Sequence, residues 1–390
     1  MIATPETPAR PGERLATTGI FLVNGLGIGA WASCIPWLRA EFGLSTGLLT
    51  LVLLGFAAGA VLAMPLAGLL APRLGTGRAT TLSAAGFALS LPLPALAGGG
   101  GWLIAAAVML GATNGALDVS MNAEASRIEQ RQGRAIMSSF HAAFSGGGLA
   151  GAALGAGLVA LHAGGLAVLW AASVLALIAA GIGRRVLGIG QVASGGAGLR
   201  LPAGSVLPLC ACALLCMLCE GAMTDWSAVY LATVAGARPA AAVAGFAAFS
   251  GAMLLGRLTG DGVVRALSRT RVVRLGAALA AAGLALAAVV PEVVPATIGF
   301  GLVGLGLSNV VPAIFSAAGE RGASPAAGIA MAATAGYAGF LIGPPVVGTI
   351  ATGFGLRASM LLLALAALAI LVLAGMFRDR RAAAQSFSEP

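Results

Sequence analysis

The chain contains no lysine, and only 9% of its 390 residues are charged. A soluble domain carries about 25% charged residues, so most of this surface does not face water. Despite its 59 glycines, a chain without lysine cannot form the Gly-Lys-Ser/Thr loop with which many ATPases hold phosphate. These shortages exclude an ordinary water-soluble domain and an ATPase of that class.

Apolar segments take the place of the missing charge. Hydrophobic residues make up 59% of the chain, and its mean hydropathy is +0.98. Apolar runs of roughly 18 residues or more cross the ~30 Å of bilayer hydrocarbon, where only a helix satisfies its own backbone. The pattern predicts an all-α membrane protein with twelve transmembrane helices, near 16–36, 45–70, 79–97, 102–124, 135–161, 166–183, 205–231, 240–258, 272–290, 296–318, 326–352 and 356–377.

Arginine is distributed unevenly between the two sides of this predicted bundle. Nineteen of the 22 arginines fall on one side, and Arg39, Arg238 and Arg357 fall on the other. Because basic loops stay in the cytoplasm, both termini are expected there, in a bacterial inner membrane. The net charge of +9 therefore indicates orientation rather than nucleic-acid binding. The first span follows a polar tail and lacks a cleavage site, so no removable signal peptide is expected.

The predicted spans form two groups of six. A cytoplasmic linker, 184–204, separates an N-terminal bundle, 16–183, from a C-terminal bundle, 205–377, with cytoplasmic tails at 1–15 and 378–390. Similar residues recur in the two bundles at offsets of 190 to 195: Gly55-Phe56-Ala57-Ala58 with Gly245-Phe246-Ala247-Ala248, Asp118 with Asn309, and Trp31 with Trp226. This near-constant offset indicates a parallel duplication.

Two parallel six-helix repeats joined by a cytoplasmic linker resemble the major facilitator superfamily. After the second span the chain reads Gly68-Leu-Leu-Ala-Pro72-Arg73-Leu-Gly75, with Pro72 where that family usually has an acid. The counterpart after the eighth span, Gly256-Arg257-Leu-Thr-Gly260-Asp261, keeps an acid. Two further stretches, Gly115-Ala-Leu-Asp118-Val-Ser-Met-Asn122-Ala-Glu124 and Glu220-Gly-Ala-Met-Thr-Asp225-Trp226, are similar to the YbjJ-like branch, which is related to fucose permeases. The resemblance implies a secondary transporter that works by alternating access.

Ionisable side chains within a span are costly in lipid and are candidates for function. In the span 102–124, Asn114, Asp118 and Asn122 recur every four residues and form one polar stripe. His141 lies at a similar depth on the next span, so we expect it to meet Asp118. Such a pair would bind and release a proton; the alternative is a structural hydrogen bond between the two helices.

The C-terminal bundle has candidates of its own. Glu220 is expected near the middle of its span, where it would couple protons or contact the solute. Asp225 and Trp226 follow on the same helix, either in the solute site or at the outer gate. Trp226 and its repeat partner Trp31 are predicted to stack on a sugar or an organic ring, with interfacial anchoring as the alternative. Further candidate solute contacts are Asn24, Asn309 and Tyr337.

Other charged and sulfur-containing residues have structural interpretations. Arg257 and Asp261, four residues apart at the end of the span 240–258, are predicted to form an ion pair that acts as a gate. A solvated loop is predicted for Glu124, Arg127, Glu129, Arg131 and Arg134. The cysteines of the seventh span are predicted to be packing residues rather than metal ligands: Cys210, Cys212, Cys216 and Cys219.

The candidate residues predict a proton-coupled transporter of a small neutral solute, such as a sugar or polyol. No arginine falls in the middle of a predicted span, so an organic anion would have no charge partner. We expect a monomer in the lipid bilayer, without a metal or other cofactor. The alternative is a proton-driven exporter of amphipathic cationic drugs or metabolites.

Two other classes of protein are less well supported by the sequence. An intramembrane serine protease would combine His141 with Ser138, Ser139 or Ser145, but the chain lacks a Gly-x-Ser-Gly setting. A sensor that no longer transports would also keep the helices. The sequence therefore predicts that the protein is not an enzyme.

Overall fold

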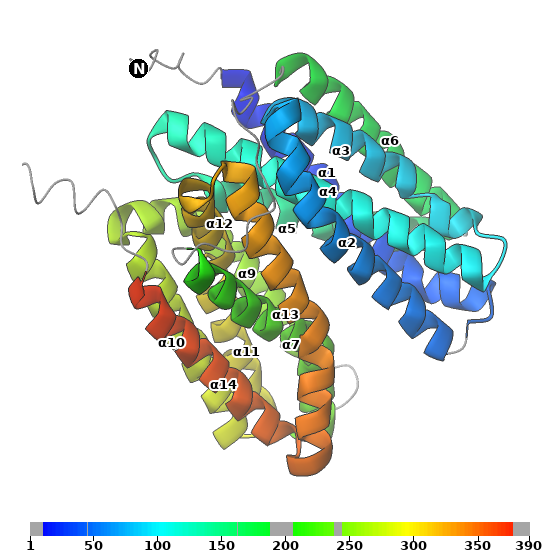
Figure 1. Ribbon diagram of the computed structural model, residues 1–390. Helices are drawn as coiled ribbons and strands as arrows, with labels where there is room; N and C mark the ends of the chain where they lie inside the picture. Colours follow the sequence, from blue (N-terminus) through cyan, green and yellow to red (C-terminus); the bar gives the residue numbers. More distant parts are fainter. Residues whose placement is uncertain (1–10, 45, 162, 188–205, 238–243, 377–390) are drawn as a thin grey trace, which may run out of the picture. The chain divides into compact units, whose positions relative to one another are not determined.

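The computed structural model describes residues 11–44, 46–161, 163–187, 206–237 and 244–376, which are almost entirely helical (Figure 1). The first six α-helices are α1 (Pro11–Glu41), α2 (Thr46–Leu74), α3 (Thr76–Ser90), α4 (Gly100–Gln132), α5 (Met137–Ala160) and α6 (Gly164–Val186). The later ones are α7 (Leu207–Thr233), α9 (Ala244–Leu267), α10 (Arg269–Val289), α11 (Val293–Leu307), α12 (Val310–Arg321), α13 (Pro325–Phe354) and α14 (Leu356–Leu373). Short 3-10 helices follow α3 and α14, at Leu93–Leu96 and Ala374–Met376.

The expected spans coincide with these helices. Each corresponds to one α-helix, except 296–318, which corresponds to α11 and α12 together. Among the described residues, ten segments are long and apolar enough to cross a membrane; α5 and α9 are the helices outside that set. The structure thus confirms the all-α fold, with ten described segments able to cross a membrane, while the count of twelve crossings stays a prediction.

The chain divides into two compact units. Unit 1 comprises 1–201 and 319–334, and unit 2 comprises 202–318 and 335–390. In unit 1, α1 packs on α5 and α6, α2 lies along α4, and α3 packs on α4 and α6 (Figure 1). In unit 2, α10 packs on α11 and α14, and α9 packs on α11 and α7. Each unit therefore has its own helix packing.

Glycine brings the backbones of α1 and α5 close together. A Cβ atom built on Gly25 or Gly29 would collide with backbone atoms of α5, and one built on Gly147 or Gly151 would collide with backbone atoms of α1. Small residues allow helices in lipid to approach closely. Such close approach matters there because van der Waals packing, and not the hydrophobic effect, holds the helices together. In unit 2, Gly339 of α13 makes the same kind of approach to α7.

Candidate functional site

A polar stripe on α4 is turned toward α1 and α5. The amide Nδ2 of Asn24 on α1 donates a hydrogen bond to Oδ1 of Asn114 on α4 over 2.9 Å, and both side chains are buried. Four residues further along α4 lies Asp118, and four further again lies Asn122. This spacing places all three on one helix face, as predicted. The contacts join the stripe to neighbouring helices.

Asn122 connects the carboxylate of Asp118 to the imidazole of His141. Its Nδ2 donates to Asp118 Oδ1 at 3.2 Å and to the Asp118 backbone carbonyl at 2.8 Å. Its Oδ1 lies 3.2 Å from His141 Nε2 on α5. Because an amide oxygen only accepts hydrogen bonds, Nε2 is the ring nitrogen that carries the hydrogen in this contact. The expected direct pair of Asp118 and His141 is thus corrected to an arrangement in which Asn122 lies between them.

One oxygen of Asp118 stands out in this arrangement. Its Oδ2 is buried and has no hydrogen-bond partner among the residues that the structure describes. A buried carboxylate oxygen without a donor is costly, so this atom favours an incoming proton or a donor group of a ligand. Nearby, the ring of Phe21 meets the imidazole of His141 edge-on, at 5.6 Å between centroids and 63° between planes. The His141 imidazole therefore has the apolar ring of Phe21 beside it as well as the amide of Asn122.

In unit 2, the structure gives Arg257 an ion-pair partner that the sequence did not predict. Its Nη2 lies 4.0 Å from Oε2 of Glu220, a residue near the middle of α7. The thiol of Cys216 is 3.6 Å from the other carboxylate oxygen. Because α9 continues to Leu267, Arg257 lies within the helix and not at its end. The statement that no arginine comes near the middle of a span is therefore wrong, and the gate pair with Asp261 stays a prediction.

Asn309 lies in the two-residue break between α11 and α12. Its Nδ2 donates to the Gly256 carbonyl at 2.9 Å and to Ser308 Oγ at 3.0 Å. Within the described part of the chain, its Oδ1 is buried and has no hydrogen-bond partner. Asn309 and its predicted repeat partner Asp118 therefore share a feature, since each has one buried side-chain oxygen without a described donor.

The aromatic candidates differ in their surroundings. Trp31 is buried in the hydrophobic core of unit 1 and stacks on Phe56 of α2, at 6.1 Å and 16°. Trp226 of α7 is half-buried beside Gly348 of α13, and its buried indole Nε1 has no hydrogen-bond partner in the ranges that the structure covers. The other two candidates in unit 2 are Asp225, which is exposed, and Tyr337, which is half-buried on α13. Their roles as solute contacts stay predictions.

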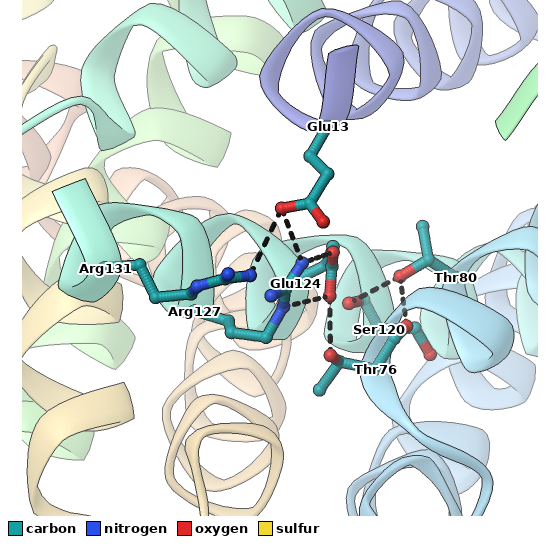
Figure 2. A network of polar contacts seen from close by, with 7 residues as sticks. All are labelled: Glu13, Thr76, Thr80, Ser120, Glu124, Arg127 and Arg131. Carbon is teal, nitrogen blue, oxygen red and sulfur yellow. Dashed lines mark hydrogen bonds and ion pairs between the residues drawn. The ribbon is translucent and has the colours of Figure 1, made fainter. Parts of the chain in front are cut away.

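Three of the residues predicted in a solvated loop belong instead to a network of ion pairs with Glu13 (Figure 2): Glu124, Arg127 and Arg131. Arg127 pairs with Glu124 at 2.5 Å and with Glu13 of α1 at 3.3 Å, and Arg131 shares the same Glu13 oxygen at 3.3 Å. Thr76, at the start of α3, donates to the fully buried Glu124 at 2.5 Å. The solvated-loop prediction is thus wrong for Glu124 and Arg127, whereas Arg134 is exposed.

Glu129 is also buried, for a different reason. One of its carboxylate oxygens accepts the backbone N–H groups of Ile136 and Met137, each at 2.8 Å. These donors are the first residue of α5 and the residue just before it, whose N–H groups have no acceptor within the helix. Glu129 therefore caps the helix that carries His141.

The residues between Gly115 and Gly133 contain a sequence signal that α4 continues beyond residue 124. No glycine or proline interrupts that stretch, so α4 continues to Gln132 and ends only where Gly133 adopts φ 64°. A longer helix would have placed Glu124 and Arg127 on packed turns. The contact with Glu13, 114 residues away in sequence, could not be seen in this pattern.

The cysteines of α7 are buried free thiols, as expected of packing residues. Within the ranges that the structure describes, no three His, Cys, Asp or Glu side chains are grouped as a metal site requires.

Comparisons with known proteins agree with this architecture. The family model described as Major Facilitator Superfamily matches residues 17–335. An uncharacterized MFS-type transporter of Yersinia pestis is 39% identical over 347 residues, covering 88% of this chain and 90% of its own. Membrane protein MosC of Rhizobium meliloti is 34% identical over 389 residues, covering 96% of this chain and 93% of its own.

Solved structures show the same fold at low sequence identity. The human organic anion transporter MFSD10 superposes with a TM-score of 0.76 at 17% identity, over 94% of this chain and 100% of its own. The E. coli fucose:proton symporter FucP gives 0.76 at 14% identity, over 94% of this chain and 98% of its own. The resemblance to the major facilitator superfamily is confirmed.

Proposed function

The chain belongs to the major facilitator superfamily, and on that premise we propose that it couples the movement of a small neutral solute to protons. The solute is of the sugar or polyol class, and the mechanism is alternating access. The arginine asymmetry supports both termini in the cytoplasm of a bacterial inner membrane. The transporter works as a monomer.

The observation that carries the proposal is the buried, unpartnered Oδ2 of Asp118. A carboxyl group out of water is stable when it is protonated, or when its ionised form accepts a hydrogen bond from a donor. A proton on Oδ2 would neutralise Asp118 and at the same time turn that oxygen into a donor. Loss of the proton requires access to water. Binding and release of a proton at this atom therefore accompany a change in access.

Asn122 gives His141 a part in this step. Imidazole is the side chain whose charge changes between pH 5 and 8. A positive charge on His141 polarises the Asn122 amide, which donates to Asp118 Oδ1. Protonation of the ring thus stabilises the carboxylate, and a neutral ring favours the protonated acid.

Charge balance supports a neutral solute. In unit 2, Arg257 is opposed by Glu220, so the charge of neither residue is left for a charged solute. In unit 1, the amides of Asn24 and Asn114 provide both donors and acceptors, which suits hydroxyl groups. The unpartnered Asp118 oxygen is equally able to accept an ammonium group, and this keeps the exporter of amphipathic cations as the second candidate.

A two-step experiment tests the proposal. Purified protein is first screened by thermal shift against sugars, polyols, organic cations and organic anions. The stabilising compound is then supplied in radiolabelled form to proteoliposomes under an imposed proton gradient. We expect concentrative uptake that a protonophore abolishes. Uptake that never exceeds equilibrium, with or without the gradient, would refute proton coupling.

A further inference from the structure

The break between α11 and α12 leaves one backbone carbonyl without its helical donor. In an α-helix the N–H of residue 312 would bond to the carbonyl of residue 308. Residue 312 is a proline, which has no N–H and whose ring crowds that carbonyl. The apolar segment Val293–Arg321 is therefore interrupted at Ser308. An unsatisfied carbonyl in such a segment costs free energy unless another donor reaches it.

Arg257 supplies that donor. Its Nε donates to the Ser308 carbonyl over 3.2 Å, from α9 to the break. Gly256 makes the approach possible, because a Cβ at this position would collide with the Ser308 side chain. Asn309 strengthens the same junction by donating back to the Gly256 carbonyl. The neighbouring helix thus holds the break at two points.

The same guanidinium faces Glu220. At 4.0 Å the separation exceeds hydrogen-bond length, so the attraction is electrostatic. The thiol of Cys216 is the other partner of this carboxylate. Of the helices packed on α7, α11 and α13 carry no charged residue, and the one charge of α14, Arg357, bonds the carbonyls of Ala288 and Val289. Helix α9 also carries Asp261 and Arg265, one and two turns beyond Arg257.

We propose that Arg257 is a positioning residue that holds the α11–α12 break while Glu220 is charged and releases it when Glu220 takes up a proton. A buried guanidinium is held in place by the carboxylates that oppose it, and protonation of Glu220 removes the charge of one of them. Arg257 then withdraws from Ser308, and the two helices bend more freely at the break. This inference rests on the proposed proton coupling. It adds a conformational change in unit 2, the bending of α11 and α12 at their break, that follows protonation of Glu220.

Hydrogen–deuterium exchange of the full-length protein in nanodiscs tests the inference without a substrate. Arg257→Gln should raise exchange about tenfold in peptides covering 305–316, because the break loses its donor. Pro312→Ala restores the missing N–H, so the double variant should return to the rate of Pro312→Ala alone. Arg265→Gln, which removes an exposed charge from the same helix, should leave these peptides unchanged. If Arg257→Gln fails to fold, Arg257→Lys replaces it, since it keeps the charge and loses the Nε donor.

Glu220→Gln, which imitates the protonated acid, tests the link between charge and break. It should raise exchange in the same peptides, and adding Arg257→Gln should cause no further increase. In a Pro312→Ala background it should have no effect. Unchanged exchange in 305–316, or an equal rise throughout the chain, overturns the inference. Proton-driven uptake is measured separately, so a chain that transports without this response refutes only the role of Arg257.

Discussion

His141 of α5 lies 3.2 Å from Asn122 of α4, ring Nε2 to amide Oδ1. The other end of the same amide donates to Asp118. A neutral side chain therefore lies between an imidazole and a carboxylate one helical turn away. The first two predictions follow from this contact.

Asp118→Asn should reduce proton-driven accumulation about tenfold or more, because an amide cannot take up and release the proton. Counterflow exchange, which needs no net proton movement, should remain measurable. Accumulation and counterflow are both measured in proteoliposomes, with the compound that the thermal-shift screen identifies. Glu41→Gln, at an exposed site on α1, is the matched control. Full accumulation by Asp118→Asn would exclude the coupling role.

His141→Ala and Asn122→Ala should shift the pH profile of uptake in the same way. In the proposed mechanism, a protonated His141 stabilises the Asp118 carboxylate through Asn122. Without either residue, Asp118 should take up its proton at a higher pH. The fall in uptake that accompanies this protonation as the pH is lowered should then also begin at a higher pH. The double variant should shift no further than one single variant, because both act through one path. Additive shifts, or a profile identical to that of the unaltered protein, would contradict the connection.

Arg127→Gln should destabilise the protein by about 3–5 kcal/mol, because it leaves the buried Glu124 without its cation. Chemical unfolding in detergent, followed by tryptophan fluorescence, measures the change. Arg134→Gln, at an exposed site just after the end of the same helix, should change stability by less than about 0.5 kcal/mol. Equal effects of the two substitutions would mean that the network in Figure 2 contributes no stability.

Trp226→Ala should weaken solute affinity about fivefold to tenfold while protein abundance stays near normal, because a half-buried indole offers a ring face and a free N–H to the solute. Isothermal titration measures affinity, and immunoblotting measures abundance. Trp102→Ala removes a largely exposed ring and is the comparison for interfacial anchoring. A loss of abundance at unchanged affinity in Trp226→Ala would favour anchoring for that residue too.

Much of the helical plan was predictable. Apolar runs place helices, because a backbone in lipid has no other way to satisfy its polar groups. The four-residue spacing of Asn114, Asp118 and Asn122 likewise placed them on one face. Helix ends differed from the expectation: α4 and α9 both continue past their expected ends. In α4 no glycine or proline interrupts the charged turns before Gly133, whereas α9 continues through Gly260 and Gly262 to Leu267.

By itself, the sequence determined the helices and the polar face of α4, which follow from local periodicity and length, and the family, which its motifs indicated. Only the tertiary structure decided the partners: Asn122 between Asp118 and His141, Glu13 with Arg127, and Arg257 with both Glu220 and Ser308. Such contacts join residues on different helices. They depend on how each helix is rotated and how closely it approaches its neighbour, and neither quantity is encoded in the spacing along one segment.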